Sequence, residues 1–408
     1  MDEEKGFIFD KIGIPKLSKK YETPFYLISE NKIRENYKRF VNSFKVKNKN
    51  MYYSVKTNFE SCVLKTLKSM GAGVEVFGKE DLLLVLSLGF NPKSIIMDGP
   101  YRPDQDLALA IKKGVHLIKV ESLDEIEKIN GLSKKQNKIA NLSLRINVPI
   151  SNYGHLLNRL DKLRQKDFGF DTKCIQSAIK KISACKNVSL IGLSSHITTI
   201  VTKPQYYKEM LKLLFCTANK LKEHNIEIKE VNLGGGYPSK GIQKFGQVMS
   251  NAYFKECEKY NIRPALVLEP GKSIVNNTTI LVGKIVSIKG KQVLTDMSIN
   301  DLGHKSIFKK RKFVIANKTK EKLTQRVNIV SSTLNPYDVL FLNAKTPRIE
   351  KGDTLVIFDV GAYSIPLSTQ FMRPRNAVYF KTSSGKIILT RRKENYKDLI
   401  QTQVKKKI

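Results

Sequence analysis

The sequence contains no uninterrupted apolar run of about 18 residues, the length that a membrane-spanning helix requires. Its first residues, Met1-Asp-Glu-Glu-Lys5, lack the basic and apolar segments of a secretory signal peptide. The five cysteines show neither a CxxC motif nor another paired spacing, so we expect reduced thiols, no disulfide bond and no metal site. Together these absences predict a cytoplasmic protein without a membrane segment.

Acidic residues are scarce: 37 Asp and Glu stand against 72 Lys and Arg, a formal net charge of +35. Such an excess is typical of nucleic-acid-binding proteins, but the lysines are scattered and gather only in short runs at 309–312 and 405–407. No helix-turn-helix, zinc-finger or RNP-like motif accompanies them, so no nucleic-acid partner is predicted. The charge is either compositional or a field that attracts an anionic substrate.

The chain has 408 residues, 41% of them hydrophobic, which is enough for a large core in two domains. Short apolar segments alternate with amphipathic helical stretches, a pattern typical of a (β/α)8 barrel, although an open doubly wound sheet would alternate similarly. The eight predicted strands are 51–55, 73–76, 94–97, 116–120, 142–148, 190–196, 230–233 and 265–268.

After about residue 275 the segments become short, alternating and bounded by Gly, Asn, Asp or Pro, which predicts a mainly β domain. We therefore expect a barrel over 31–275 and a C-terminal β domain over 276–408. Residues 1–30 contain a strand-like piece at 23–29, and we expect this N-terminal segment to join the β domain.

The most informative stretch is Met51-Tyr-Tyr-Ser-Val-Lys-Thr-Asn58, where Lys56 stands at the C-terminal end of a predicted buried strand. Lysine is rarely buried without a partner, and an amine held in a mostly apolar pocket becomes nucleophilic because its pKa falls. Lys56 is therefore a candidate Schiff-base lysine, with a lysine that reaches solvent at the barrel rim as the alternative.

Other predicted strand ends carry residues suited to chemistry. Gly234-Gly-Gly236 follows an apolar strand, and its backbone N–H groups could hold a phosphate. Glu269-Pro-Gly-Lys272 places a carboxylate and a cation after another strand, and His196 ends a third, where a flat imidazole could stack on a cofactor ring. A tight turn, a surface turn and a core histidine are the alternatives for these three features.

Taken together, these parts are those of a pyridoxal phosphate site, and their order resembles the fold-type III pyridoxal-phosphate decarboxylases that act on ornithine, diaminopimelate and arginine. The resemblance covers residues from about 20 to 385. The matching motifs are Tyr53-Ser-Val-Lys56-Thr-Asn58, Gly71-Ala-Gly-Val-Glu-Val76, His196-Ile-Thr-Thr199, Gly234–Gly236, Glu269–Lys272, Gly361-Ala-Tyr363 and Phe371-Met-Arg-Pro-Arg375.

The resemblance implies an alanine racemase-like fold and a homodimer with its active site at the interface. It implies that Lys56 attaches pyridoxal phosphate, that His196 stacks on the ring and that Glu269 holds the pyridine nitrogen protonated. The remaining residues that it places around the cofactor are Thr199, Gly234, Gly235, Gly236, Gly271, Lys272 and Tyr363.

The sequence departs from the family at the substrate. Leu334 and Asn335 stand where the family has a catalytic cysteine and an adjacent acid, and His304 and Phe308 replace the Arg and Tyr of an Arg-Pro-x-x-Tyr segment. Asn335, His304 and Tyr337 are the predicted substrate-binding residues. Lys56, Tyr337 or water is predicted to return the proton to Cα.

These departures lead us to expect an anionic amino-acid-type substrate, with a citrate-conjugated diamino acid of siderophore biosynthesis as the main hypothesis. Diaminopimelate, ornithine or lysine is the alternative substrate of such a decarboxylase. An amino-acid racemase or epimerase and a non-catalytic homologue are further alternatives, since each could share the barrel.

Overall fold

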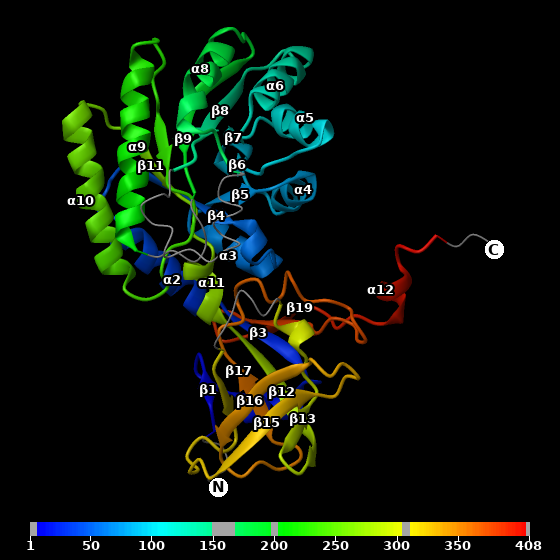
Figure 1. Cartoon of the computed structure of the whole chain (residues 1–408). Coiled ribbons are helices and arrows are strands. Elements are labelled where there is room, and N and C mark those ends of the chain that lie inside the picture. The colour runs from blue at the N-terminus through cyan, green and yellow to red at the C-terminus, as the bar shows by residue number, and fades with distance from the viewer. Residues whose placement is uncertain (1–5, 149–167, 197–202, 304–310, 405–408) are drawn as a thin grey trace. The chain divides into compact units, whose positions relative to one another are not determined.

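The computed structural model describes residues 6–148, 168–196, 203–303 and 311–404 of the chain (Figure 1). These residues form two compact units. The barrel unit comprises residues 36–56 and 64–274, and the β unit comprises residues 1–35, 57–63 and 275–408. The chain therefore passes between the two units more than once.

The barrel unit contains a closed barrel in which eight parallel strands follow one another in chain order. Its last strand, β11, pairs with its first strand, β4, which closes the ring. The strands are β4 Lys49–Ser54, β5 Gly73–Val76, β6 Ile95–Met97, β7 Leu117–Val120, β8 Ala140–Arg145, β9 Val188–Ser194, β10 Glu230–Asn232 and β11 Ala265–Leu268.

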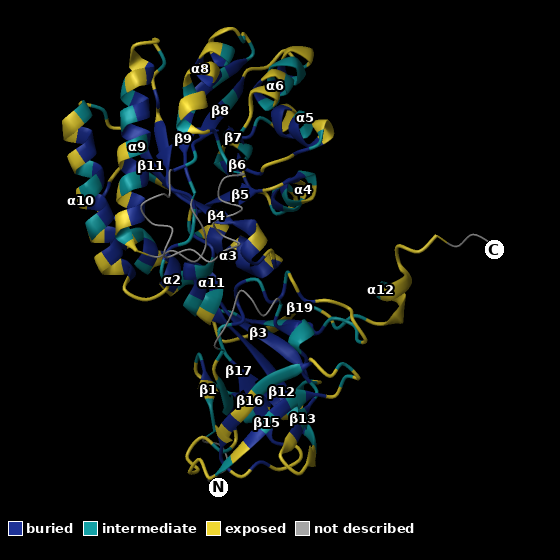
Figure 2. Cartoon of the chain, in the orientation of Figure 1, coloured by how far each residue is buried: buried dark blue, intermediate teal, exposed yellow. Residues whose placement is uncertain are grey.

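Helices cover the outside of the barrel, so its strands are buried on both faces and appear dark blue in Figure 2. Inside the barrel, Tyr52, Ile96, Leu117 and Val267 pack together. None of the helices in the described ranges combines the length and the apolar composition needed to cross a membrane. The helices are α2 Glu30–Ser43, α3 Ser61–Ser69, α4 Lys79–Ser87, α5 Asp104–Lys113, α6 Leu123–Lys135, α8 Ile175–Ser183, α9 Pro204–Lys222, α10 Ile242–Tyr260 and α11 Lys272–Val275.

The β unit is built on a nine-stranded sheet in which β3, Phe25–Ser29, lies between β12 and β18. The N-terminal part of the chain thus pairs with strands from its C-terminal part. Besides β3, the elements are β1 Ile8–Phe9, β2 Ile12–Gly13, α1 Ile14–Lys20, β12 Thr279–Lys289, β13 Gln292–Thr295, β14 Phe313–Ile315, β15 Gln325–Ser331, β16 Val339–Thr346, β17 Thr354–Ile357, β18 Ala377–Lys381, β19 Ile387–Arg391 and α12 Tyr396–Ile400.

The predicted fold class is confirmed: a closed eight-stranded parallel barrel accompanies a separate, mainly β unit. All eight predicted barrel strands exist, and ring closure rules out the open sheet. The sequence did not predict helix α1 or strand β13, because both are short and lack a clear period.

Gly246 allows helix α10 to pack closely against the end of α2. A Cβ atom at Gly246 would collide with the Ser43 carbonyl and lie 2.7 Å from the Ser43 side chain, and this backbone carbonyl cannot rotate away. We expect Gly246→Ala to lower the free energy of unfolding by about 1–3 kcal/mol through overpacking. Urea unfolding followed by circular dichroism measures the change.

Gly131, inside helix α6, provides the matched control, since a Cβ there would meet no atom within 4 Å. Gly131→Ala should raise the free energy of unfolding by up to about 1 kcal/mol, because alanine is the better helix former. Equal effects of the two substitutions would contradict the close packing of α10 on α2.

Candidate active site

Lys56 lies directly after strand β4, in a single 3-10 turn formed by Val55–Thr57. Its Nζ contacts Oε1 and Oε2 of Glu75 at 3.1 and 3.4 Å. The side chain is 57% exposed, so the expectation of an amine in a mostly apolar pocket was wrong. A buried carboxylate, and not desolvation, is what the structure provides for this amine.

Glu75, in strand β5, is buried and holds the end of β4 in two ways. Oγ of Ser54 donates to Oε2 of Glu75 at 2.5 Å, while the same carboxylate accepts from Lys56. Glu75 therefore fixes the position of the lysine amine relative to the barrel. Glu75 belongs to the Gly71–Val76 motif, for which no individual role was predicted.

A chain of alternating charges connects the neighbouring strands β6, β7 and β8 with the C-terminal end of β11, which is not their neighbour in the ring. Nζ of Lys119 in β7 lies 2.8 Å from Oδ2 of Asp98 and 2.6 Å from Oε1 of Glu269. Nη1 of Arg145 lies 3.6 Å from Oδ1 of Asp98 and 2.7 Å from Oε1 of Glu121. All five side chains are largely buried, so each charge depends on its neighbours for compensation.

This pairing determines the ionisation of the buried carboxylates. Burial would raise the pKa of Asp98, but the charges of Lys119 and Arg145 outweigh burial and hold that pKa well below its usual value. Burial also raises the pKa of Glu269, and here Lys119 only partly opposes it. For Lys119, burial favours the neutral amine, but Asp98 and Glu269 raise its pKa overall.

A turn of glycines lies against His196 at the end of β10. Gly234 has a φ of +63°, and a Cβ there would lie 2.6 Å from Nδ1 of His196, so only glycine fits. A Cβ on Gly235 would lie 2.8 Å from the Glu269 carbonyl oxygen. Gly236 also has a positive φ, of +91°. The three glycines thus form a turn that carries no side chains of its own.

His196 is a neutral imidazole in this setting. The N–H of Gly235 donates to its Nδ1 at 3.2 Å, so the ring proton lies on Nε2. Burial, followed by the charges of Arg145 and Lys56, lowers the pKa of His196 to about 3. A neutral, flat ring at this place is the form that can stack on an aromatic cofactor.

These residues fit pyridoxal phosphate. Oε1 of Glu269 accepts from Lys119 and from Asn232, and within the described residues no hydrogen bond reaches Oε2. Glu269 therefore has one oxygen that can receive a ring N–H. The amine of Lys56, the glycine turn and the segment Gly271–Lys272 at the start of α11 lie on ends of the same barrel.

Tyr363 belongs to the β unit, where two of the predicted motifs meet. Its N–H donates to the carbonyl of Thr57 at 2.8 Å, and the Asn58 amide donates to the carbonyl of Gly361 at 2.9 Å. A Cβ on Gly361 would collide with the Val275 carbonyl, which explains the glycine. Asn58 therefore acts as the link between the lysine motif and the Gly361–Tyr363 motif.

The predicted substrate residues Asn335 and Tyr337 lie in the β unit, in the loop between β15 and β16. Oδ1 of Asn335 accepts from the backbone N–H of Tyr337 at 3.0 Å, which shapes the turn. Leu334 and Tyr337 are 89% and 78% exposed. His304 and Thr199 lie outside the described residues.

Sequence reasoning missed five charged residues of the site: Glu75, Asp98, Lys119, Glu121 and Arg145. A signal for them existed, because Lys119 interrupts the apolar strand Leu117–Val120 and the other four stand at or near strand ends. Charged residues at the C-terminal ends of barrel strands are candidates for catalysis.

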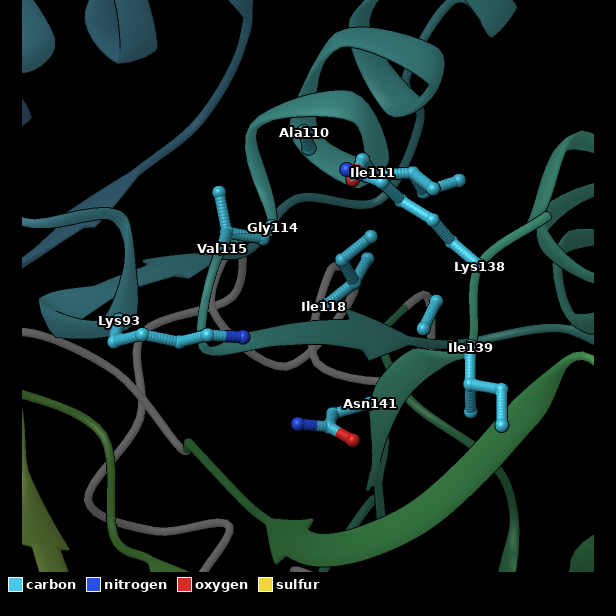
Figure 3. A pocket seen from close by; sticks show the side chains of 10 residues that line it. Lys93, Ala110, Ile111, Gly114, Val115, Ile118, Lys138, Ile139 and Asn141 are labelled. Carbon is cyan, nitrogen blue, oxygen red and sulfur yellow. Dashed lines mark hydrogen bonds between the residues drawn. The ribbon is translucent and has the colours of Figure 1, made fainter. Parts of the chain in front are cut away.

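A cavity of about 210 Å³ lies elsewhere on the barrel unit (Figure 3). Its lining includes Lys93, Val115 and Ile139, which precede strands β6, β7 and β8. The cavity therefore opens at the N-terminal ends of the strands. Active sites of such barrels form at the C-terminal ends, so this cavity is not the candidate site.

Comparison with known proteins agrees with this geometry. A family model described as "Pyridoxal-dependent decarboxylase, pyridoxal binding domain" matches residues 30–276, which include Lys56, His196 and Glu269. The matched range also contains all eight barrel strands.

Relatives match almost the whole chain. Diaminopimelate decarboxylase of Methanocaldococcus jannaschii is 28% identical, over 98% of this chain and 95% of its own. The enzyme of that name from Aquifex aeolicus is 26% identical, over 98% and 96%. The structure of the M. jannaschii enzyme in complex with L-lysine has a TM-score of 0.90 at 26% identity and covers 99% of both chains.

These relatives bear on the substrate expected from the sequence. Their names specify diaminopimelate, and the solved complex contains L-lysine rather than a citrate conjugate. The comparisons thus favour the diaminopimelate alternative over the siderophore-type substrate.

The lowered pKa of His196 predicts a pH dependence of stability. The unfolded state binds a proton below about pH 6.5 whereas folded His196 stays neutral, so the stabilisation is full above that pH and is lost on acidification. When the pH is lowered from about 7 to 5, the free energy of unfolding should decrease in both proteins. The decrease should be about 1–2 kcal/mol smaller for His196→Asn than for wild type.

Urea unfolding of the cofactor-free proteins across this pH range tests the prediction. His224→Asn removes an exposed imidazole and serves as the matched control. Parallel pH profiles for wild type and His196→Asn would show that His196 is not held neutral.

Proposed function

The chain belongs to the pyridoxal-dependent decarboxylase family, and on this premise we propose that it removes CO2 from meso-diaminopimelate to give L-lysine. It is a pyridoxal-phosphate-dependent carboxy-lyase. The observation that carries the choice of substrate is the similarity of nearly the whole chain to diaminopimelate decarboxylases.

We assign the cofactor-binding roles as follows. Lys56 attaches the cofactor, His196 covers one face of its ring and Glu269 receives the ring N–H on Oε2. The phosphate is assigned to the glycine turn together with Thr199, Gly271, Lys272 and Tyr363. The free backbone geometry at Gly234 and Gly236 supports this assignment, since both positions require a positive φ.

When bound, pyridoxal phosphate supplies an electron sink that takes up the electron pair left on Cα as CO2 departs. Glu269 favours that sink because a buried anion beside the ring nitrogen stabilises its protonated form. Neutral His196 adds no positive charge of its own against the ring. The alternating charges around Lys119 keep Glu269 in place without adding net positive charge.

Lys56 is the proposed donor of the proton that returns to Cα. Its Nζ is held by Glu75 at 3.1 Å, so the carboxylate orients the amine and stabilises its protonated form, which is the form that can donate. Leu334, which replaces the family's cysteine, has no proton to give. The proposed substrate contacts are Asn335, Tyr337 and His304.

We further propose a homodimer in which the loop 331–338 reaches the partner subunit. The carboxylate of Asp338 holds this loop in shape, because it accepts from Ser298 Oγ at 2.5 Å, Ile299 N at 2.8 Å and Thr333 Oγ1 at 2.7 Å. A fixed loop that presents exposed Leu334 and Tyr337 is suited to insertion into a second copy.

The substrate assignment predicts that cofactor-loaded protein releases CO2 from meso-diaminopimelate with a kcat on the order of 1 per second or more. L-Lysine, L-ornithine and L-arginine should react far more slowly. Lys56→Ala should lower turnover by a factor on the order of a thousand and abolish the absorbance of lysine-bound cofactor. CO2 release and chiral chromatography of the products provide the measurement.

Three outcomes would contradict the assignment. Turnover of a citrate-conjugated diamino acid without turnover of meso-diaminopimelate would identify a different substrate. Racemisation without CO2 release would identify a different reaction, and full activity of Lys56→Ala would disprove the role of Lys56.

The dimer is tested with Leu334→Arg. An arginine at this place would have to be buried without a partner, so light scattering should show a shift from dimer to monomer at micromolar protein. Ile139→Arg, at a residue that is 67% exposed in the barrel unit, is the control and should leave the dimer intact. A monomeric wild-type protein would contradict the proposal.

A further inference from the structure

Lys119 is a fully buried lysine in the middle of an apolar strand. Only 1% of its side chain is exposed, and it stands in β7 between Ile118 and Val120, which are buried as well. Burying an ammonium costs several kcal/mol unless nearby anions compensate for it. Two carboxylates do so here, and one of them is Glu269.

The contact with Lys119 determines the orientation of the Glu269 carboxylate. Nζ of Lys119 lies 2.6 Å from Oε1 of Glu269, and the Asn232 amide donates to the same oxygen at 2.8 Å. Asn232 is itself fixed, because its Oδ1 accepts from the N–H of Gly234 at 2.7 Å. Two donors on one oxygen hold the carboxylate plane and direct Oε2 away from them.

The backbone of Lys119 is held as firmly as its side chain. Arg102, also fully buried, donates to the Lys119 carbonyl at 2.5 Å and to the Met97 carbonyl at 3.2 Å. Its guanidinium also pairs with Glu125, which neutralises its charge. Arg102 thereby ties β7 to the end of β6, which leads into Asp98.

Without Lys119, the ionised form of Glu269 would be disfavoured. Burial raises the pKa of Glu269, and the charges of Glu75 and Asp98 raise it further, while Lys119 is the main opposing influence. The titratable or charged groups that act electrostatically with Glu269 come from several elements: Tyr52 on β4, Glu75 on β5, Asp98 after β6, Lys119 on β7, Arg145 on β8 and Tyr237 after β10.

We propose that Lys119 is a positioning residue that keeps Glu269 ionised and turned so that Oε2 faces the pyridine nitrogen of the cofactor. This inference rests on the proposed role of Glu269. Asp98 contributes as well, because its negative charge offsets the positive charge of Lys119. The ring nitrogen thus meets three charged residues with a net charge of −1.

The proposal predicts a proton linkage. Without Lys119, two buried carboxylates are left together, and one of them takes up a proton. A pyridinium N–H can then bind Glu269 only if that proton is released. The affinity of such a variant should therefore rise with pH, by up to about tenfold per pH unit, whereas wild-type affinity should lack this dependence.

The probe is deoxypyridoxine phosphate, which keeps the ring nitrogen and the phosphate but has no aldehyde to react with Lys56. Calorimetric titration in two buffers of different ionisation enthalpy gives both the affinity and the number of protons released. We expect Lys119→Met to release up to one proton more than wild type at about pH 7 and to bind at least about tenfold more weakly. If Lys119 had only a structural role, Lys119→Met would change the affinity without releasing an additional proton.

Asp98→Asn is the matched control. It breaks the same ion pair from the other side, yet it leaves Glu269 paired with Lys119, so no additional proton should be released. The double variant Lys119→Met with Asp98→Asn removes the pair together, which buried pairs tolerate better than the loss of one partner. It keeps the test available if Lys119→Met does not fold, and it should still release more proton than Asp98→Asn.

The outcomes distinguish a wrong role for Lys119 from a wrong role for Glu269. If Glu269→Gln binds the analogue as wild type does, the proposed contact of Glu269 with the ring nitrogen is wrong. If Glu269→Gln weakens binding but Lys119→Met releases no additional proton, only the role of Lys119 is wrong. Proton release by Asp98→Asn equal to that of Lys119→Met would overturn the assignment to Lys119 as well.

Discussion

Charge can be buried inside a protein only where opposite charge is buried with it, and the candidate site is organised by this constraint. Glu121, Arg145, Asp98, Lys119 and Glu269 alternate in sign across the ends of several barrel strands. The residues come from four strands or the segments that follow them: Asp98 after β6, Lys119 in β7 and Glu121 directly after it, Arg145 in β8 and Glu269 after β11. The pairs therefore form only when the barrel has closed in its correct register, so the chemistry of the site depends directly on the fold.

The sequence predicted much of this architecture because barrel strands are apolar on both faces and alternate with amphipathic helices. Lys56 and Glu269 could be found for the same reason, since each stands just after such a strand. Their partners could not be found in this way. Lys119 and Glu269 are far apart in sequence and lie on strands that are not neighbours in the ring, so only closure of the barrel brings their side chains together. The exposure of Lys56 likewise depends on side-chain packing that no sequence period encodes.

Two motifs that are distant in the sequence are joined by hydrogen bonds in the β unit. Asn58 donates to the Gly361 carbonyl, and Thr57 accepts from Tyr363, so the residues after Lys56 serve as a docking point for the Gly361–Tyr363 turn. Tyr363 adopts a left-handed φ of +62°, which is costly for a residue with a side chain and persists only when its surroundings hold it. The hydrogen bond to Thr57 contributes to that restraint.

The central place of β3 in the sheet has a consequence for biosynthesis. All eight barrel strands lie between β3 and its partner β12 in the chain, and its other partner, β18, comes later still. On the ribosome, the apolar segment Phe25–Ile28 thus emerges early and has no partner strand to join until β12, Thr279–Lys289, has been made. An unpaired apolar strand is a site of aggregation. Until its partners are made, this segment can be kept from aggregating only by contacts other than its native sheet.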